Sequence, residues 1–399
     1  MKLYNTLSQQ IEPVTSDDGI FRMYVCGITP YDTTHLGHAF TYVCFDVLGR
    51  YLEFLGYKTI RVENVTDIDD DILKRAAKVG VAWDALVKQE TDKFLADMQA
   101  LNVRPPDYYP YASQEIPKIL EIIVDLLAKG NAYERNGSVY YDTHSDSGFG
   151  QLAGMDYTEM LNTANERGNF PDDPNKRDPL DFVLWQAAKP GEPTWDSPWG
   201  KGRPGWHIEC TAINLRYLGS RVDIHSGGAD LIFPHHDCEI AQSEHYSGDR
   251  PFVRYWFHIA MVRLANEKMS KSLGNMLFVS DLLKTYSADA IRLYLLSHKY
   301  RDAWDADNYT ADLTAAEETL ARWRVALALP DGSDEPLNAL PYEATFGDAM
   351  DDDLDTARAI DHLDELADAI AGAPHMQLGQ TQAALRMLGA VLGFTFASK

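Results

Sequence analysis

A mostly apolar segment that leads into a glycine-containing loop and then into a long apolar helix limits the fold of this chain more than any other feature. Residues 21–26 have the character of a buried strand, and residues 27–37 are rich in Gly, Pro, Thr and Asp. Residues 39–55 carry apolar side chains at helical spacing, and residues 58–64 predict the next strand. This order predicts an α/β protein with a Rossmann-like parallel sheet that binds a nucleotide.

The middle of the chain predicts a lobe inserted into this sheet domain. Eleven of the 36 residues from 171 to 206 are Gly or Pro, and the same segment holds four of the eight Trp residues. We expect irregular surface structure there and not a linker, because linkers are not rich in Trp. Amphipathic helices are expected at 83–101 and 114–129, and a further strand at 221–225.

A change in composition places a domain boundary late in the chain. Residues 329–342 contain three prolines together with Gly and Ser, and the segments 343–371 and 380–392 are expected to be helical. We therefore expect a catalytic-type domain at 1–310 with the inserted lobe at about 100–205, followed by a C-terminal helical bundle at 311–399.

Composition indicates a folded protein of the cytoplasm. Hydrophobic residues make up 45% of the 399 residues, which is enough to bury a core without a disulfide framework. The chain has no apolar run of about 18 residues and no apolar signal region at its start, so we expect no membrane association. Cys26, Cys44, Cys210 and Cys238 are too few and too scattered for a set of disulfides. We also expect a monomer.

The charge balance argues against a nucleic-acid partner. The formal net charge is −24, and residues 331–399 contain 13 acidic and only three basic residues. A protein that binds RNA needs a basic surface that displaces counterions from phosphates. We therefore do not expect the C-terminal segment to bind an RNA backbone.

His35-Leu-Gly-His38 lies where the first loop meets the helix. The start of a helix offers N–H groups and partial positive charge to a phosphate, and Gly37 lets a ligand approach the backbone. Both imidazoles can donate hydrogen bonds to phosphate oxygens. Two surface histidines beside a helix cap would give the same pattern.

A second motif, Lys-Met-Ser-Lys-Ser from Lys268 to Ser272, places two cations among small hydroxyl residues. Alone it is also consistent with a solvated basic turn. Together with the His35–His38 motif, it resembles the signature pair of class I aminoacyl-tRNA synthetases. The resemblance implies that ATP and an amino acid form an aminoacyl-adenylate, with His35, His38, Lys268 and Lys271 as catalytic residues and Mg²⁺ accompanying ATP.

A third set of residues indicates the amino acid. Cys26, Cys210 and His235 are residue types that bind zinc, and Glu239 follows His235 at i+4. Spacing alone favours two buried thiols and a capping histidine. The resemblance to cysteine-activating members implies that Cys26, Cys210 and His235 hold one zinc ion, with Glu239 as a further ligand. The cysteine thiolate then binds the zinc, which separates cysteine from serine better than a pocket of apolar groups can.

The two remaining cysteines are not expected to bind zinc. Cys238 lies at i+3 from His235, so spacing does not exclude it, but it matches no ligand position of the family. Cys44 lies within the apolar helix and is expected in the core.

The same resemblance implies a cysteine and adenylate site that draws on several loops. Trp206, Thr66 and Asp230 are expected around the backbone of the cysteine. The full expected substrate set is Cys26, Gly27, Ile28, Thr29, Thr41, Asn64, Val65, Thr66, Trp206, Gly228, Ala229, Asp230 and Val262.

Two kinds of cysteine-activating enzyme fit this chemistry, and four features favour the mycothiol-pathway ligase over the tRNA enzyme. The segments 26–32 (Cys-Gly-Ile-Thr-Pro-Tyr-Asp), 166–171 (Glu-Arg-Gly-Asn-Phe-Pro) and 300–304 (Tyr-Arg-Asp-Ala-Trp) resemble that ligase. The basic anticodon-reading tail of the tRNA enzymes does not follow the C-terminal bundle. The expected acceptor is therefore the amine of glucosaminyl-inositol, and tRNA is the alternative.

Two features oppose this preference. Asn169-Phe170 replaces the Gly-Asp of the ligase element, and Glu239, followed by Ile-Ala-Gln-Ser-Glu, resembles the tRNA enzymes. A relative that uses another amine, and a synthetase-like regulator without catalysis, also remain possible interpretations. The complete phosphate-binding motifs argue against the regulator, because binding alone does not need them.

Lys271→Ala should slow formation of the adenylate by roughly two or more orders of magnitude, as expected when one preorganised charge donor is lost. Cysteine-dependent pyrophosphate exchange measures this rate. The dissociation constant for cysteine should change far less, because the lysine acts mainly on charge that develops in the transition state. An unchanged exchange rate would mean that residues 268–272 form only a surface turn.

Overall fold

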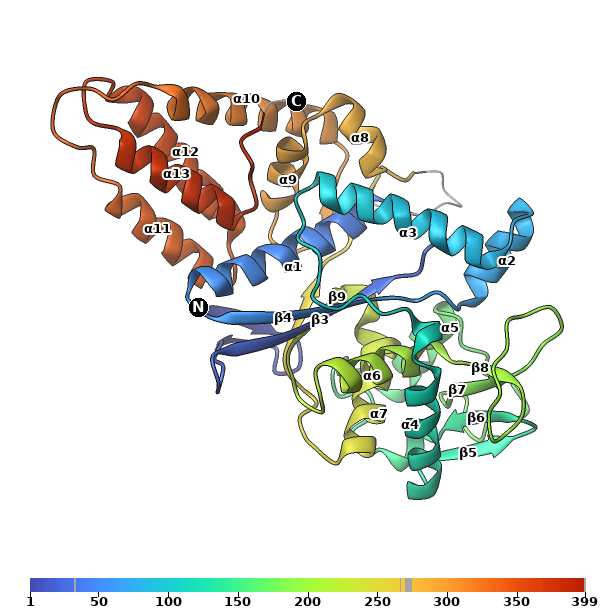
Figure 1. Cartoon of the computed structure of the whole chain (residues 1–399). Helices are drawn as coiled ribbons and strands as arrows, with labels where there is room; N and C mark the ends of the chain where they lie inside the picture. The colour runs from blue at the N-terminus through green and yellow to red at the C-terminus, as the bar shows by residue number, and fades with distance from the viewer. Residues whose placement is uncertain (32–33, 266, 270–274, 398–399) are drawn as a thin grey trace.

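The structure is a computed structural model that describes residues 1–31, 34–265, 267–269 and 275–397 (Figure 1). A four-stranded parallel sheet forms its centre, in the order β10-β9-β3-β4. The strands are β3 (Ile20–Ile28), β4 (Lys58–Val65), β9 (Val222–Gly228) and β10 (Val253–Ile259). The parallel sheet confirms the predicted α/β class.

Both faces of the sheet are buried, as is usual for parallel strands. Phe21 and Met23 of β3 lie in the core shared with helix α1 (Leu36–Phe54), whereas Tyr24 and Cys26 lie in a second core on the other face. This alternation follows from the two-residue period of a strand. It explains why the sequence of β3 is apolar along most of its length.

The inserted lobe is more regular than the sequence predicts. Residues 171–206 contain two strands of a four-stranded antiparallel sheet, so the expectation of irregular structure for this segment was wrong in part. Phe182, Leu184 and Trp185 are buried in the core of the lobe, but the surrounding Gly and Pro residues hide the short strand in the sequence. The lobe strands are β5 (Ala132–Arg135), β6 (Ser138–Tyr141), β7 (Phe182–Ala187) and β8 (Gly202–Pro204).

Helices connect the lobe to the parallel sheet. In Figure 1 the lobe lies on the opposite side of the sheet from the C-terminal helices. The helices of this part are α2 (Asp70–Val79), α3 (Trp83–Ala100), α4 (Ile116–Lys129), α5 (Tyr157–Glu166), α6 (Trp206–Tyr217) and α7 (Asp237–Ser247). Two small sheets flank the centre: β1 (Lys2–Asn5) with β2 (Gln10–Pro13), and β11 (Val262–Leu264) with β12 (Glu267–Lys268) and β13 (Trp304–Asp305).

The C-terminal part consists of helices, as predicted, but the expected helix at 343–371 is interrupted. It forms α11 and α12, with a break that contains Asp353 and Leu354 at positive φ. The Asp353 carboxylate accepts hydrogen bonds from Tyr4 N at 2.7 Å and Tyr300 Oη at 2.6 Å. These contacts to distant segments, which no local pattern reveals, stabilise the break. The helices are α8 (Val279–Thr285), α9 (Ala288–Leu296), α10 (Tyr309–Ala328), α11 (Leu340–Asp351), α12 (Thr356–Gly372) and α13 (Gly379–Val391).

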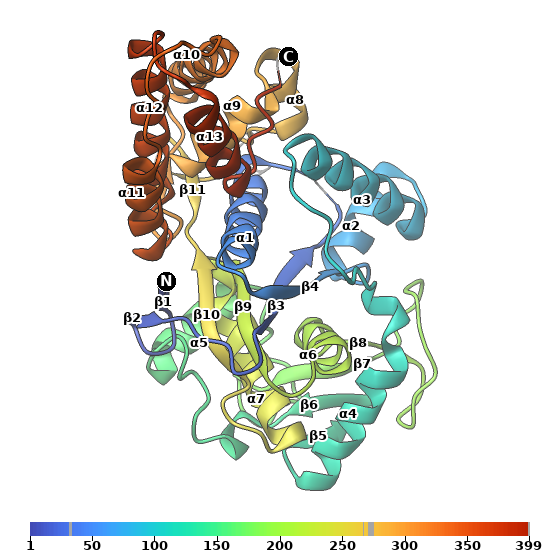
Figure 2. The same ribbon diagram turned by 60° about the vertical axis from the view of Figure 1, so that its left-hand side comes forward.

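One apolar core extends from α1 through α9 into these helices, which lie beside α1 in both views (Figures 1 and 2). Cys44 is buried in this core, in agreement with its expected structural role. No helix within the described residues is both long and apolar enough to cross a membrane.

A buried carboxylate joins α1 to the C-terminal helices. Asp46 accepts hydrogen bonds from Arg292 at 2.6 Å, Arg50 at 2.7 Å and Arg104 at 3.1 Å. Arg292 is fully buried and also donates to the carbonyl of Leu392 at the end of α13. Burial opposes the charge, but the three guanidinium groups hold the pKa of Asp46 below its usual range.

Asp46→Ala should lower the free energy of unfolding by about 3–5 kcal/mol, because it leaves buried cations without their partner. Urea unfolding followed by circular dichroism measures the change. Because the pKa of Asp46 is lowered in the folded protein, its contribution to the free energy of unfolding is complete above the unfolded pKa of about 3.9. This contribution is lost as the pH falls through the pKa of Asp46 in the folded protein. The control is Asp92→Ala, which removes an exposed pair with Lys88 and should cost less than about 1 kcal/mol. Equal losses of unfolding free energy in the two variants would contradict the stabilising role of the buried Asp46 carboxylate.

Candidate active site

A large cavity lies at the carboxyl edge of the parallel sheet, where the sheet faces the inserted lobe. Its volume is about 1470 Å³. Strand β3 pairs with β4 on one side and with β9 on the other, so the strand order of the sheet reverses beside β3. Ligands of α/β sheets bind at such switch points. The predicted site residues on the cavity wall are Cys26, Gly27, Ile28, Thr29, His35, His38, Thr41, Thr66, Trp206, Cys210, Gly228, Asp230, His235 and Val262.

Four predicted residues, Asn64, Val65, Ala229 and Glu239, are not part of the described wall. Asn64 is fully buried and its side-chain oxygen accepts hydrogen bonds from Gly27 N at 2.8 Å and Tyr24 Oη at 2.7 Å. Asn64 therefore holds the end of β3 in place.

Gly27 is required by the close approach of β3 and β4. A β-carbon at this position would lie 1.4 Å from the carbonyl oxygen of Asn64. The pairing register of the two strands also shifts between Val25 and Ile28. This irregularity brings the end of β3 to the cavity, since Cys26, Gly27 and Ile28 all line it.

The first motif forms the start of α1, as predicted. His35 caps the helix by accepting a hydrogen bond from Gly37 N at 3.1 Å, and its ring stacks on that of His38 with the centroids 3.8 Å apart. A β-carbon on Gly37 would lie 3.0 Å from the ring of His35, so glycine makes room for this cap. The amide of Leu36 donates to the carbonyl of Leu277 at 2.8 Å. Because these two amides are already bonded, the imidazoles are the groups better able to contact a phosphate.

The second motif is described only in part. Lys271 and Ser272 lie outside the described residues. Lys268 ends β12, which pairs with β11, the strand that begins at Val262 on the cavity wall. The first residue of the motif therefore belongs to a strand that pairs with a strand starting at the cavity wall.

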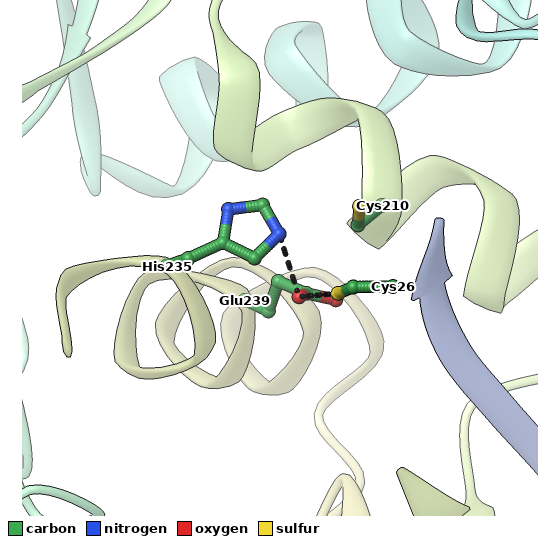
Figure 3. Close-up of side chains that lie close together, drawn as sticks. All are labelled: Cys26, Cys210, His235 and Glu239. Carbon is green, nitrogen blue, oxygen red and sulfur yellow. Dashed lines mark hydrogen bonds and ion pairs between the residues drawn. The ribbon is translucent and has the colours of Figure 1, made fainter. Parts of the chain in front are cut away.

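The side chains of Cys26, Cys210, His235 and Glu239 lie close together (Figure 3), and the first three of them line the cavity. They come from β3, α6, the single-turn helix Ile232–His236 and α7, and their ligand-type atoms all lie within 4.8 Å of one another. His235 Nε2 is 3.2 Å and Cys26 Sγ is 3.7 Å from Glu239 Oε1. The i, i+4 spacing therefore does place His235 and Glu239 together.

The geometry of this cluster fits a metal ion. Tetrahedral zinc, with bonds of about 2.0–2.3 Å, separates its ligand atoms by roughly 3.3–3.8 Å, which is close to the observed distances. All four residues are buried, and His235 Nε2 makes no hydrogen bond of good geometry in the described structure. Two thiols, an imidazole and a carboxylate are ligands that zinc accepts.

Surrounding groups hold each of these side chains in place. His207 Nδ1 lies 2.9 Å from His235 Nδ1, so His235 directs its Nε2 toward Glu239. Glu239 Oε2 accepts from Asn214 Nδ2 at 3.2 Å and contacts His225 Nε2 at 3.1 Å. Its other oxygen, Oε1, is therefore the one that faces the cluster. Such outer contacts typically fix the orientation of metal ligands.

The electrostatics of the cluster favour the charged forms of Cys210, His235 and Glu239 and the neutral thiol of Cys26. Burial raises the pKa of the Cys26 thiol, while the hydrogen bond from Cys26 lowers the pKa of Cys210 to about 6. Burial acts against a charged imidazole, yet the neighbouring Cys210 raises the pKa of His235 to about 10. Burial likewise opposes the Glu239 carboxylate, but His225 and His235 lower the pKa of Glu239 to about 2. The site thus carries negative charge that a cation can compensate.

A second group overlaps the first and consists of Cys26, Glu239, His225 and His236. In this group His225 Nε2 lies 3.1 Å from Glu239 Oε2, and His236 Nδ1 lies 2.7 Å from His258 Nε2. Cys238 belongs to neither group, although it is fully buried nearby.

Sequence reasoning did not single out His207, Asn214, His225, His236 or His258. All of them except His207, which is half-buried, are buried around the cluster. The signal that could have found them is the concentration of six of the twelve His residues between positions 207 and 258, several of them within apolar segments. Histidines in such segments need partners when buried.

Comparison with known proteins agrees with this geometry. The model of the tRNA synthetases class I (C) catalytic domain matches residues 12–316, and that of the DALR domain matches residues 345–397. Cysteine--tRNA ligase of Dehalococcoides mccartyi strain 195 is 47% identical over 366 residues, which cover 90% of this chain and 78% of the relative.

Two further proteins bear on the fold and the activity. The L-cysteine:1D-myo-inositol 2-amino-2-deoxy-alpha-D-glucopyranoside ligase of Thermobifida fusca is 47% identical over 349 residues, covering 87% of this chain and 83% of the relative. Methionyl-tRNA synthetase of Mycobacterium tuberculosis, solved with methionyl-adenylate, shares the fold with a TM-score of 0.65 at 16% identity, over 94% of this chain and 88% of that one. The chain therefore belongs to the cysteine-activating class I aminoacyl-tRNA synthetase family, whose members are ATP-dependent cysteine ligases.

Proposed function

We propose that this enzyme activates L-cysteine with ATP to give cysteinyl-adenylate and then transfers the cysteine to tRNA. The observation that carries the proposal is the buried set of Cys26, Cys210, His235 and Glu239 at the inner end of the cavity. We assign these four side chains as the ligands of one zinc ion. His235 supports the assignment, because its Nε2 lacks a well-formed hydrogen bond although it is buried.

The site is suited to a small thiol. A zinc ion held there would supply a soft Lewis acid, which prefers a thiolate to the hydroxyl of serine. The side chain of Trp206 stacks on His235 with the ring centroids 4.4 Å apart and closes this end of the cavity. Thr66 and Asp230, on the adjoining wall, are proposed to orient the carboxylate and the amine of cysteine.

The adenylate is proposed to lie along the carboxyl edge of the sheet. Gly27, Thr29, Thr41, Gly228 and Val262 line the cavity on this edge. His35 and His38 are close enough to act as one unit on the α-phosphate, since their rings stack. Lys268 and Lys271 are proposed to offset charge on the leaving pyrophosphate, with Mg²⁺. Attack by the cysteine carboxylate on the α-phosphorus breaks the bond to pyrophosphate and needs no covalent bond to the protein.

Two observations support tRNA as the acceptor, the alternative of the sequence analysis, over glucosaminyl-inositol. Curated relatives of comparable identity are mostly cysteine--tRNA ligases, including those of Dehalococcoides mccartyi and Cronobacter sakazakii. Glu239, the feature that resembles the tRNA enzymes in the sequence, is part of the buried ligand set. The absence of a basic tail carries no weight here, because the relatives are longer than this chain.

The amine of glucosaminyl-inositol is the second candidate, favoured by the charge of the cavity wall. The end of α5 and the loop after it contribute Glu166, Asp172 and Asp173 to the wall, and the start of α2 contributes Asp69, Asp70 and Asp71. These acidic residues outnumber the basic residues of the wall, which are Lys74, Arg167, Lys176, Lys189 and Arg203. Carboxylates suit a cationic amine with many hydroxyl groups better than they suit a phosphate backbone. The relative from Thermobifida fusca carries out this type of ligation according to its name.

The two acceptors can be separated in one assay. The protein, ATP and radiolabelled cysteine are incubated with tRNA specific for cysteine or with glucosaminyl-inositol, and AMP release and labelled product are measured. We expect labelled tRNA, with a yield that falls steeply as salt rises, because phosphate contacts release counterions. Periodate-oxidised tRNA is the matched control, since it lacks the accepting ribose hydroxyl and should stay unlabelled. Ligation of the amino-sugar without labelling of tRNA would favour the second candidate.

Cys210→Ala should remove zinc from the protein and abolish cysteine-dependent pyrophosphate exchange, because a four-ligand site loses one thiolate. Metal content by inductively coupled plasma mass spectrometry measures the first effect. Cys238→Ala is the control: this buried cysteine lies in neither ligand group and its replacement should leave zinc in place. Full zinc content in Cys210→Ala would disprove the proposed ligand set.

A further inference from the structure

A chain of three hydrogen bonds runs from the N-terminal hairpin to the metal-binding thiol of Cys26. Thr6 Oγ1 lies 2.7 Å from His258 Nδ1, and His258 Nε2 lies 2.7 Å from His236 Nδ1. His236 Nε2 lies 3.3 Å from Cys26 Sγ. The two histidines and the thiol are buried, whereas Thr6 is partly exposed. The chain thus connects the surface to the inner end of the cavity.

The packing of neighbouring groups fixes the geometry of this chain. The ring of Trp256 stacks on His258 with an interplanar angle of 2° and tilts against His236 at 33°. The side chain of Asn5 accepts from Trp256 N at 3.1 Å, so the hairpin is held in register beside β10. Neither imidazole can rotate without breaking these contacts.

The protons in the chain must all point the same way. A neutral imidazole has one N–H donor and one acceptor nitrogen. The contact of 2.7 Å between His258 Nε2 and His236 Nδ1 is a hydrogen bond only if one of these nitrogens carries a proton and the other does not. Either both rings carry the proton on Nε2 and donate toward Cys26, or both carry it on Nδ1 and donate toward Thr6.

The proposed role of Cys26 as a metal ligand favours donation toward Cys26. A metal-bound thiolate carries no proton, so the contact of 3.3 Å between His236 Nε2 and Cys26 Sγ is a hydrogen bond only if His236 donates. His236 Nδ1 then accepts from His258 Nε2, and His258 Nδ1 accepts from the hydroxyl of Thr6, at 2.7 Å each. Both rings carry their proton on Nε2, and the hydroxyl proton of Thr6 points to His258 and not to the carbonyl of Trp256, which lies 3.2 Å away.

We propose that Thr6 is a positioning residue for the metal-binding thiolate of Cys26, and that it acts through a one-way donor chain formed by His258 and His236. This inference rests on the proposed metal site. An N–H group from His236 stabilises and orients a thiolate, whereas the opposite direction would place a nitrogen lone pair against it. Outer contacts of this kind typically change metal affinity by about 10–100-fold.

The first test measures zinc affinity by competition with a chelator of known affinity. Thr6→Val removes the hydroxyl at nearly constant volume and should weaken zinc binding about tenfold. Thr6→Ser keeps the hydroxyl and should bind zinc within about twofold of the unmodified protein. The control is Thr15→Val, because Thr15 also lies beside β10 in the N-terminal region but contacts Tyr255 and Arg254.

Each outcome of this comparison decides a different point. Unchanged zinc affinity in Thr6→Val would overturn the positioning role while leaving the proposed metal site intact. Equal losses in Thr6→Val and Thr15→Val would also overturn it, since any damage to this region would then suffice. An unmodified protein that binds no zinc would disprove the metal site, and the inference with it.

The second test needs no variant and applies even if Thr6→Val does not fold. Long-range proton–nitrogen NMR of the zinc-loaded, ¹⁵N-histidine-labelled protein reports which ring nitrogen carries the proton. We expect both His236 and His258 to be protonated on Nε2. Protonation of either ring on Nδ1 would reverse the chain and overturn the proposal.

Discussion

The burial of Glu239 is the constraint on which the rest of the site depends. A carboxylate with no exposed surface must have partners, because an isolated buried charge is too costly to keep. His225 and Asn214 satisfy one of its oxygens and leave the other facing Cys26 and His235. Two contacts thus satisfy one oxygen of Glu239, and a group of potential metal-ligand atoms surrounds the other.

The parallel sheet brings the four residues of this cluster together from distant parts of the sequence. Cys26 lies near the carboxyl end of β3, and the other three residues of the cluster follow about 185–215 residues later on α6, the turn before α7, and α7 itself. Parallel strands place their carboxyl ends at one edge, so segments distant in sequence meet there without long loops. The close approach of Gly27 to Asn64 then brings the end of β3 to the cavity wall.

The parts of the molecule that could be predicted are those that depend on local patterns or on motifs. The strand at 20–28 and helix α1 follow from apolar periodicity, and Cys26, Cys210, His235 and Glu239 from residue type and resemblance. The lobe strands were missed because six residues of β7 are embedded among Gly and Pro. Asn214, His225 and the histidines behind Cys26 were missed because their partners lie 11 to 252 residues away, and a hydrogen bond between such positions leaves no periodic signal.

Sequence identity does not choose between the two proposed acceptors. The chain is 47% identical both to a cysteine--tRNA ligase and to an amino-sugar ligase. The cluster of Cys26, Cys210, His235 and Glu239 comes from β3, α6, the turn before α7 and α7. The loop at 166–176, by contrast, belongs to the inserted lobe and lines the same cavity. Its Asn169-Phe170, in place of the Gly-Asp of the amino-sugar ligase element, therefore alters a part of the cavity wall that lies outside this cluster.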